Sequence, residues 1–224
     1  MTVPEGGTAE QTAGVQARER YGLILALILG GYVLGGFNDS AIVRLGNALI
    51  WMVVLLTALW SPGIPVRLRQ AASVGVIAFF VLVTVLAFVD NDTVVGVMVL
   101  VVAAMQFLTV LAILSRIALH DRVRLQTVMG GIAAYAMLAF AMAAVYRGVD
   151  LLLAEPLLDG VVAQGDYQYF SFVTLTTLGY GDIVPATDVG KRLVVIEGFA
   201  GQVFLVTLVA RLVSLWEPRR SRNL

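Results

Sequence analysis

The chain has 224 residues, of which 59% are hydrophobic and 13% are charged. Soluble globular proteins carry about 25% charged residues, so this composition excludes an ordinary soluble protein and indicates an integral membrane protein. The net charge is zero and there are no cysteines, so we expect no nucleic-acid partner and the sequence allows no disulfide and no thiolate chemistry.

The apolar segments predict six membrane-spanning helices. A spanning helix needs about 20 mostly apolar residues, and the segments that suit such helices run approximately over 21–38, 41–60, 71–89, 93–115, 124–147 and 190–214. Residues 1–20 are polar and contain no apolar core, so we expect a cytoplasmic tail rather than a cleavable signal peptide. The acidic turn Asp90-Asn91-Asp92 is expected to cap the fourth helix.

The placement of basic residues predicts that both termini lie in the cytoplasm, because Lys and Arg favour that side of a membrane. With six spans and both termini inside, four of the 15 Lys and Arg residues fall outside: Arg44, Arg147, Lys191 and Arg192. The cell membrane is the expected location. The basic tail over residues 218–224 is expected to contact anionic lipid.

The segment between the fifth and sixth predicted spans differs from both. Residues 167–176 are too short to cross a bilayer but suit a helix that enters it halfway, with Asp166 as the candidate N-cap. Residues 176–182 then read Thr-Thr-Leu-Gly-Tyr-Gly-Asp. A loop can replace the water around a cation if its carbonyls point at one axis, and Gly179 and Gly181 tolerate the positive φ that such a loop requires.

This stretch resembles the selectivity filter of tetrameric potassium channels, in which backbone carbonyls coordinate the ion. The resemblance covers approximately residues 122–215 and implies a pore module over residues 121–217, made of an outer helix, a pore helix, a filter and an inner helix. It implies that the filter consists of Thr177, Leu178, Gly179, Tyr180 and Gly181. The first four of these would bind K⁺ through their carbonyls, and the Thr177 hydroxyl would close the innermost site.

The same resemblance implies a set of supporting residues: Thr176, Asp182, Tyr169 and Phe170. The side chains of Leu178 and Tyr180 would pack behind the filter strand. Some family members carry a tryptophan pair where Tyr169 and Phe170 stand, and Phe170 cannot donate the corresponding hydrogen bond to Tyr180.

One chain supplies one filter strand, and surrounding an ion with oxygens takes four. We therefore expect a homotetramer with the pore on its symmetry axis, embedded in membrane lipid. The expected fold class is an all-α membrane protein with six transmembrane helices per chain, a re-entrant pore helix and a filter loop. K⁺ is the expected transported ion, and we expect no organic cofactor and no soluble ligand.

The sixth span offers candidates for gating. Gly201 stands where many potassium channels carry a hinge glycine, and a glycine within a helix permits either bending or close packing. Helical spacing makes one set of residues candidates for the cavity and an apolar gate: Gln202, Leu205, Val209 and Val213. Glu197 is a candidate proton-sensitive brace behind the filter, and the alternative is a neutral or paired glutamate that bonds to the pore helix of its own or a neighbouring subunit.

The first four predicted helices, within residues 21–120, are expected to form a transmembrane bundle. Residues 94–115 carry no charge, whereas a voltage-sensing helix needs charges that cross the field. We therefore predict a voltage-insensitive, potassium-selective channel. A weakly selective cation channel and a non-conducting membrane subunit remain alternatives. An enzyme is not expected, because the sequence shows no nucleophile–base pair and no metal-ligand cluster.

Overall fold

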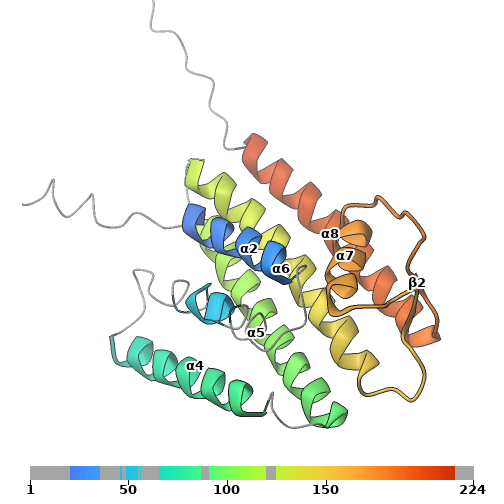
Figure 1. The fold of residues 1–224 in the computed structure, drawn as a ribbon. Coiled ribbons are helices and arrows are strands. Elements are labelled where there is room, and N and C mark those ends of the chain that lie inside the picture. Colours follow the sequence, from blue (N-terminus) through green and yellow to red (C-terminus); the bar gives the residue numbers. More distant parts are fainter. Residues whose placement is uncertain are drawn as a thin grey trace, which may run out of the picture.

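The computed structural model describes residues 21–35, 46, 49–54, 56, 66–86, 91–119 and 125–214. Its elements in chain order are shown in Figure 1: α2 (Tyr21–Gly35), α4 (Val66–Leu86), α5 (Asp92–Leu119), α6 (Leu125–Asp150), β1 (Leu158–Asp159), α7 (Gln164–Leu175), β2 (Val184–Pro185) and α8 (Asp188–Ser214). The protein is mostly helical. Both predicted tails, residues 1–20 and 218–224, lie outside the described residues.

Three of the described helices are long and apolar enough to cross a membrane. Their spanning parts are Asp92–Ser115, Val128–Asp150 and Asp188–Arg211, and they correspond to the predicted fourth, fifth and sixth spans. The predicted spans 21–38, 41–60 and 71–89 each include residues outside the described part of the chain. The six-span layout therefore stays a prediction.

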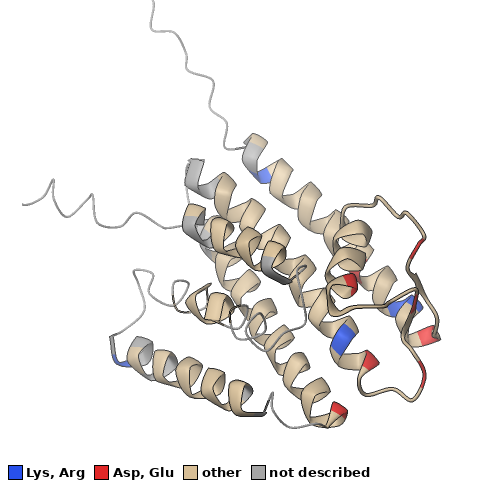
Figure 2. Cartoon of the chain, viewed as in Figure 1, with Lys and Arg blue, Asp and Glu red and all other residues tan. Residues whose placement is uncertain are grey.

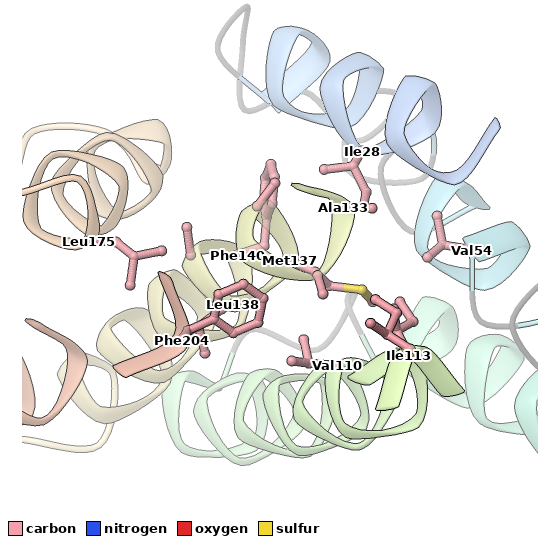
Figure 3. Packing of buried hydrophobic residues seen from close by; sticks show 14 residues of the cluster. Ile28, Val54, Val110, Ile113, Ala133, Met137, Leu138, Phe140, Leu175 and Phe204 are labelled. Carbon is pink, nitrogen blue, oxygen red and sulfur yellow. The ribbon is translucent and has the colours of Figure 1, made fainter. Parts of the chain in front are cut away.

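Helix α6 lies at the centre of the described structure, in contact with α2, α5, α7 and α8. Small side chains along it, including Ala133 and Ala139, are fully buried and let neighbouring helices approach closely. Larger residues fill the space between the helices. Figure 3 shows Met137 and Phe140 of α6 between α2 and α5, in one cluster with Leu175 of α7.

The predicted bundle over residues 21–120 is seen in part. Helices α2 and α5 lie against α6, and α4 has its contacts with α5, so two of the described helices pack directly on the predicted pore module. The predicted cap of the fourth helix is confirmed, because Asn91 Oδ1 accepts a 3.1 Å hydrogen bond from Val94 N. The prediction that residues 21–120 form one transmembrane bundle stays a prediction.

The structure contains a small two-stranded ribbon, so the expectation of an all-α fold is not fully correct. Strand β1 pairs antiparallel with β2, with Leu158 opposite Pro185, and Ala186 N donates a further 3.0 Å hydrogen bond to Leu157 O. The ribbon ties the segment after α6 to the segment before α8. Two residues per strand are too few to give a sequence signal, and no strand was expected there.

Candidate functional site: the α7 helix and the loop that follows it

Helix α7 begins three residues earlier than predicted. Its N-cap is Ala163, so the expectation that Asp166 is the N-cap is wrong. Asp166 instead reaches back from the first turn, where its Oδ2 accepts hydrogen bonds from Val162 N (2.7 Å) and Ala163 N (2.8 Å). A carboxylate here also interacts favourably with the positive end of the helix dipole.

The loop after α7 alternates between negative and positive φ. Thr177, Gly179 and Gly181 have φ of 61°, 55° and 79°, and Thr177 is the one non-glycine residue with positive φ in the described part of the chain. The sequence predicted positive φ at the two glycines. It did not predict Thr177, since a β-branched residue rarely adopts this conformation, at a cost of about 1–3 kcal/mol.

The N–H groups of this loop point back at α7. Leu178 N and Gly179 N both donate to Val173 O, at 2.9 and 3.3 Å, and Thr177 N donates to Thr174 O at 3.0 Å. In a trans peptide the N–H and the preceding carbonyl point in opposite directions. The carbonyls of residues 176–178 therefore point away from α7.

The last turn of α7 ends with its carbonyls paired inside the chain. Phe172 O accepts from Thr176 N and from Thr176 Oγ1, at 3.0 and 2.6 Å. Leu175 O accepts a 2.8 Å hydrogen bond from the hydroxyl of Tyr135 on α6. Helix C-termini normally leave four carbonyls unpaired, so the pairing fixes the end of α7. Thr176, an expected supporting residue, takes part in it, and Tyr135 was missed by the sequence analysis.

A second support lies at the C-terminal end of the loop. The hydroxyl of Tyr169 on α7 donates a 2.7 Å hydrogen bond to Asp182 Oδ2, and this bond holds the pKa of Asp182 below its ordinary value. The contact joins two of the expected supporting residues. Phe170 is buried instead against Tyr146 of α6, with ring centroids 5.1 Å apart.

The side chains of the loop are uncovered within one chain. Leu178 and Tyr180 are 60% and 68% exposed, although the resemblance implied that both pack behind the strand. A large aromatic side chain exposed to this degree gains little from its own chain. Any packing of these two residues has to come from outside the single chain.

Helix α8 has one packed face and one open face. Glu197, Gly201 and Phe204, at helical spacing, face α6 and α7 and are buried. The candidate cavity residues Gln202, Leu205, Val209 and Val213 are exposed. The four candidates therefore lie on the open face of α8, away from the face that packs against α6 and α7.

Gly201 is a point of close approach between α8 and α7. A Cβ added there would come within 2.6 Å of Leu175 Cδ1 and 3.3 Å of Leu175 O, so the glycine lets α8 touch the end of α7. Helix α8 continues through this position without interruption. The arrangement fits the close-packing alternative, and a hinge at Gly201 stays a prediction.

Glu197 is fully buried and contacts both α6 and α7. Its Oε2 lies 2.5 Å from the hydroxyl of Tyr146 on α6, and its Oε1 contacts Ser171 Oγ on α7. Glu197 therefore bonds to the α7 of its own chain, which is the geometry expected of a brace. A proton-sensing role stays a prediction. Tyr146 and Ser171 gave no sequence signal, since they lie 51 and 26 residues from Glu197.

Acidic residues, coloured red in Figure 2, gather at the end of the protein that carries this loop. One of them is structural. Asp150, the last residue of α6, accepts hydrogen bonds from Leu157 N at 2.5 Å and from the hydroxyl of Tyr167 on α7. The carboxylate thereby joins the end of α6 to the first turn of α7. No local sequence pattern marks Asp150 and Tyr167 as partners, since they lie 17 residues apart.

Comparison with known proteins adds a family match over this part of the chain. The model of a family described as "Ion channel" matches residues 132–217, which include most of α6 and all of α7, the loop and α8. That is less than half of the 224 residues. No solved structure is similar enough to count as a match.

Two curated relatives carry more specific names. The chain is 51% identical over 49 residues to Two-pore potassium channel 4 of Arabidopsis thaliana, covering 22% of this chain and 17% of the relative. It is 38% identical over 81 residues to Two pore potassium channel b of Oryza sativa subsp. japonica, covering 30% and 23%. The chain thus spans less than a quarter of the length of each relative.

The similarity and the long apolar helices together support an ion-channel domain in a membrane protein, and they favour a channel over an enzyme. Residues 132–217 are similar to an ion-channel family, within a chain that has three helices capable of crossing a membrane among its described residues.

Proposed function

We propose that four copies of this chain form a potassium-selective channel in a membrane. In this proposal K⁺ passes along the symmetry axis, and the carbonyls of Thr177, Leu178, Gly179 and Tyr180 from each copy replace its hydration water. Gly181 and Asp182 complete the outer end of the filter. K⁺ is the transported substrate, and both chain termini lie in the cytoplasm.

The observation that carries the proposal is the backbone of residues 176–181. Positive φ at Thr177, Gly179 and Gly181 alternates with negative φ, and the N–H groups of residues 177–179 are taken up by α7. Together these features turn the carbonyls of residues 176–178 away from α7, and the proposal extends this row of oxygens to Gly179 and Tyr180. Such a row of oxygens is unusual in a membrane protein, because unpaired backbone at membrane depth is tolerated only where it lines a cavity or is covered by protein.

The exposed side chains support assembly with further copies. One loop cannot surround an ion, and Leu178 and Tyr180 are mostly exposed in their own chain. The open face of α8 is apolar over Leu205, Val209 and Val213. In a tetramer this face would line the inner cavity, where rings of valine can close a pore by excluding water. Gly201 could serve as hinge in the same helix.

The names of the two relatives support K⁺ as the ion. The stretch of α5 over residues 94–115 has no charged side chain, which supports conduction without a charged voltage sensor. The cell membrane, with its lipids around the tetramer, is the proposed location.

A flux assay on the purified protein in liposomes tests the proposal. We expect potassium flux that exceeds sodium flux by a wide margin, and we expect Gly179→Ala to abolish it, because alanine is strained at a φ of 55°. Gly75→Ala is the matched control, since an added Cβ at this helical position meets nothing within 4 Å. It should conduct like the wild type.

Two other outcomes would replace the proposal with its alternatives. Comparable sodium and potassium flux, lost in Gly179→Ala, would indicate a weakly selective cation channel. No rubidium flux through a well-folded tetramer would indicate a non-conducting membrane subunit. Flux that persists unchanged in Gly179→Ala would contradict the role of the loop altogether.

A further inference from the structure

A cluster of four oxygen-bearing groups lies behind the loop, buried between α6, α7 and α8. It consists of the hydroxyls of Tyr146 and Ser171, the carboxyl group of Glu197 and the carbonyl of Ala139. All four residues have zero exposure. Nothing in the proposed conduction path uses this cluster, so its chemistry needs an explanation of its own.

The number of hydrogens in the cluster decides the protonation state of Glu197. Three oxygen–oxygen contacts are present: Tyr146 to Glu197 at 2.5 Å, Ser171 to Glu197, and Ser171 to Ala139 O at 2.7 Å. Each contact this short needs one hydrogen between the two oxygens. The two hydroxyls supply one hydrogen each, so the third must be carried by the carboxyl group of Glu197.

An ionised Glu197 would leave one contact without a hydrogen. Ser171 could then donate to the carboxylate or to Ala139 O, but not to both. Two oxygens without a hydrogen between them repel at 2.7 Å. With the proton present, Glu197 donates to Ser171 Oγ, Ser171 donates to Ala139 O, and Tyr146 donates to Glu197 Oε2, so every group is satisfied.

The surroundings of Glu197 also favour the neutral form. The titratable groups that face it from α6 are Tyr146 and, at longer range, Tyr135. Helix α7 presents Ser171 to it. Tyr167, one turn earlier on α7, bonds to Asp150 instead. On α8, Lys191 pairs with Asp188 at the surface. Arg147 follows Tyr146 on α6 and lies within electrostatic range of Tyr167.

A buried carboxylate is costly unless a cation is paired with it. The recorded partners of Glu197 are two hydroxyls, from Tyr146 and Ser171. Hydroxyl groups alone offset only part of the cost of removing a full charge from water. The surroundings and the hydrogen count therefore point to the same protonation state.

We propose that Glu197 is held as a neutral carboxylic acid whose proton fastens α7 between α6 and α8, and that its loss at alkaline pH releases α7 and stops conduction. The second half rests on the proposed function. Ser171 lies two residues before Val173, whose carbonyl accepts the N–H groups of Leu178 and Gly179. A shift of α7 at Ser171 is thus passed directly to the loop, and Glu197 acts as a positioning residue.

Infrared spectroscopy tests the protonation state without any need for conduction. The difference spectrum between the wild type and Glu197→Gln at neutral pH should contain the C=O stretching band of a protonated carboxylic acid, shifted in D₂O and absent from the variant. Asp188→Asn is the matched control, because Asp188 is an exposed acid on the same helix. Its difference spectrum should show carboxylate bands only.

Ser171→Ala gives an independent check should Glu197→Gln fail to fold. This substitution removes the acceptor of the Glu197 proton, so the carboxylic acid band should persist and move to the higher frequency of a weaker hydrogen bond. Carboxylate bands in place of the acid band at neutral pH would overturn the proposal.

The pH profile of potassium flux tests the second half. Wild-type flux should be lost as the pH is raised, whereas Glu197→Gln should keep its flux with a flat profile. The glutamine amide can donate to Ser171 and accept from Tyr146 without a titrating proton. An acid band with a flat wild-type profile would refute the release of α7. An acid band without flux at any pH would refute the proposed function and leave the neutral Glu197 in place.

Discussion

The hydroxyl of Tyr135 on α6 donates a 2.8 Å hydrogen bond to the carbonyl of Leu175, the last residue of α7. Gly201 of α8 packs against the same leucine. The position at which the α7 helix ends and the following loop begins is therefore fixed from two sides, by one hydrogen bond and one close contact.

Removal of the Tyr135 hydroxyl should weaken the protein. We expect Tyr135→Phe to lower the free energy of unfolding by about 0.5–1.5 kcal/mol, the usual net contribution of one hydrogen bond. Thermal or denaturant unfolding of the purified protein measures it. Tyr32→Phe is the matched control, since Tyr32 contributes ring contacts with Phe140 and Phe172 that the substitution keeps. Equal stability of the two variants would rule out a role for the Tyr135 bond.

Gly201→Ala should destabilise the protein through a steric clash. The added methyl group would lie 2.6 Å from Leu175 Cδ1, and overpacking of this kind typically costs about 1–3 kcal/mol. Gly198→Ala, one turn earlier on α8, meets nothing within 4 Å and should not lose stability. A Gly201→Ala protein that unfolds like the wild type but gates differently would instead support the hinge.

The bond between Tyr169 and Asp182 should appear in the acid stability profile. The folded-state pKa of Asp182 lies below its ordinary value of 3.8. Asp182 therefore contributes stability above that value, and the contribution is lost as the pH falls through the folded-state pKa. Tyr169→Phe removes the main cause of the shift, so its stability should depend less on pH in this acidic range. Identical acid profiles for the wild type and the variant would speak against the contact.

Replacing Thr177 with glycine should raise the stability of the protein and lower its conduction. Its φ of 61° is strained for a β-branched residue, so Thr177→Gly should remove a strain of about 1–3 kcal/mol, partly offset by the greater freedom of glycine in the unfolded chain. The same variant loses the hydroxyl expected at the innermost ion site and should conduct less well. Thr177→Ser keeps the hydroxyl and the Cβ and serves as the control. Lower stability in Thr177→Gly than in Thr177→Ser would show that no strain is stored there.

Local features of the structure could be predicted from the sequence, and distant contacts could not. The three long apolar helices and the positive φ of Gly179 and Gly181 follow from hydropathy and from the absence of a Cβ. The start of α7 was misjudged because Asp166 acts from inside the first turn rather than from the cap. A carboxylate can serve either position, and the sequence alone does not separate them.

The hydrogen-bond partners of Leu175 and Glu197 could not be predicted from the sequence. Tyr135 lies 40 residues from Leu175, and Tyr146 lies 51 residues from Glu197. No local pattern marks a tyrosine as the donor to such a distant acceptor, because only the packing of α6 against α7 and α8 brings them together. Glu197 itself could be singled out, since an acid within an apolar span is costly without a partner.

A density map of the assembled protein in potassium-rich solution tests the central claim most directly. The account predicts four copies of residues 177–180 around one axis, with their carbonyls turned inward and ion density between them. Loops that are splayed apart, or carbonyls turned away from a shared axis, would contradict it.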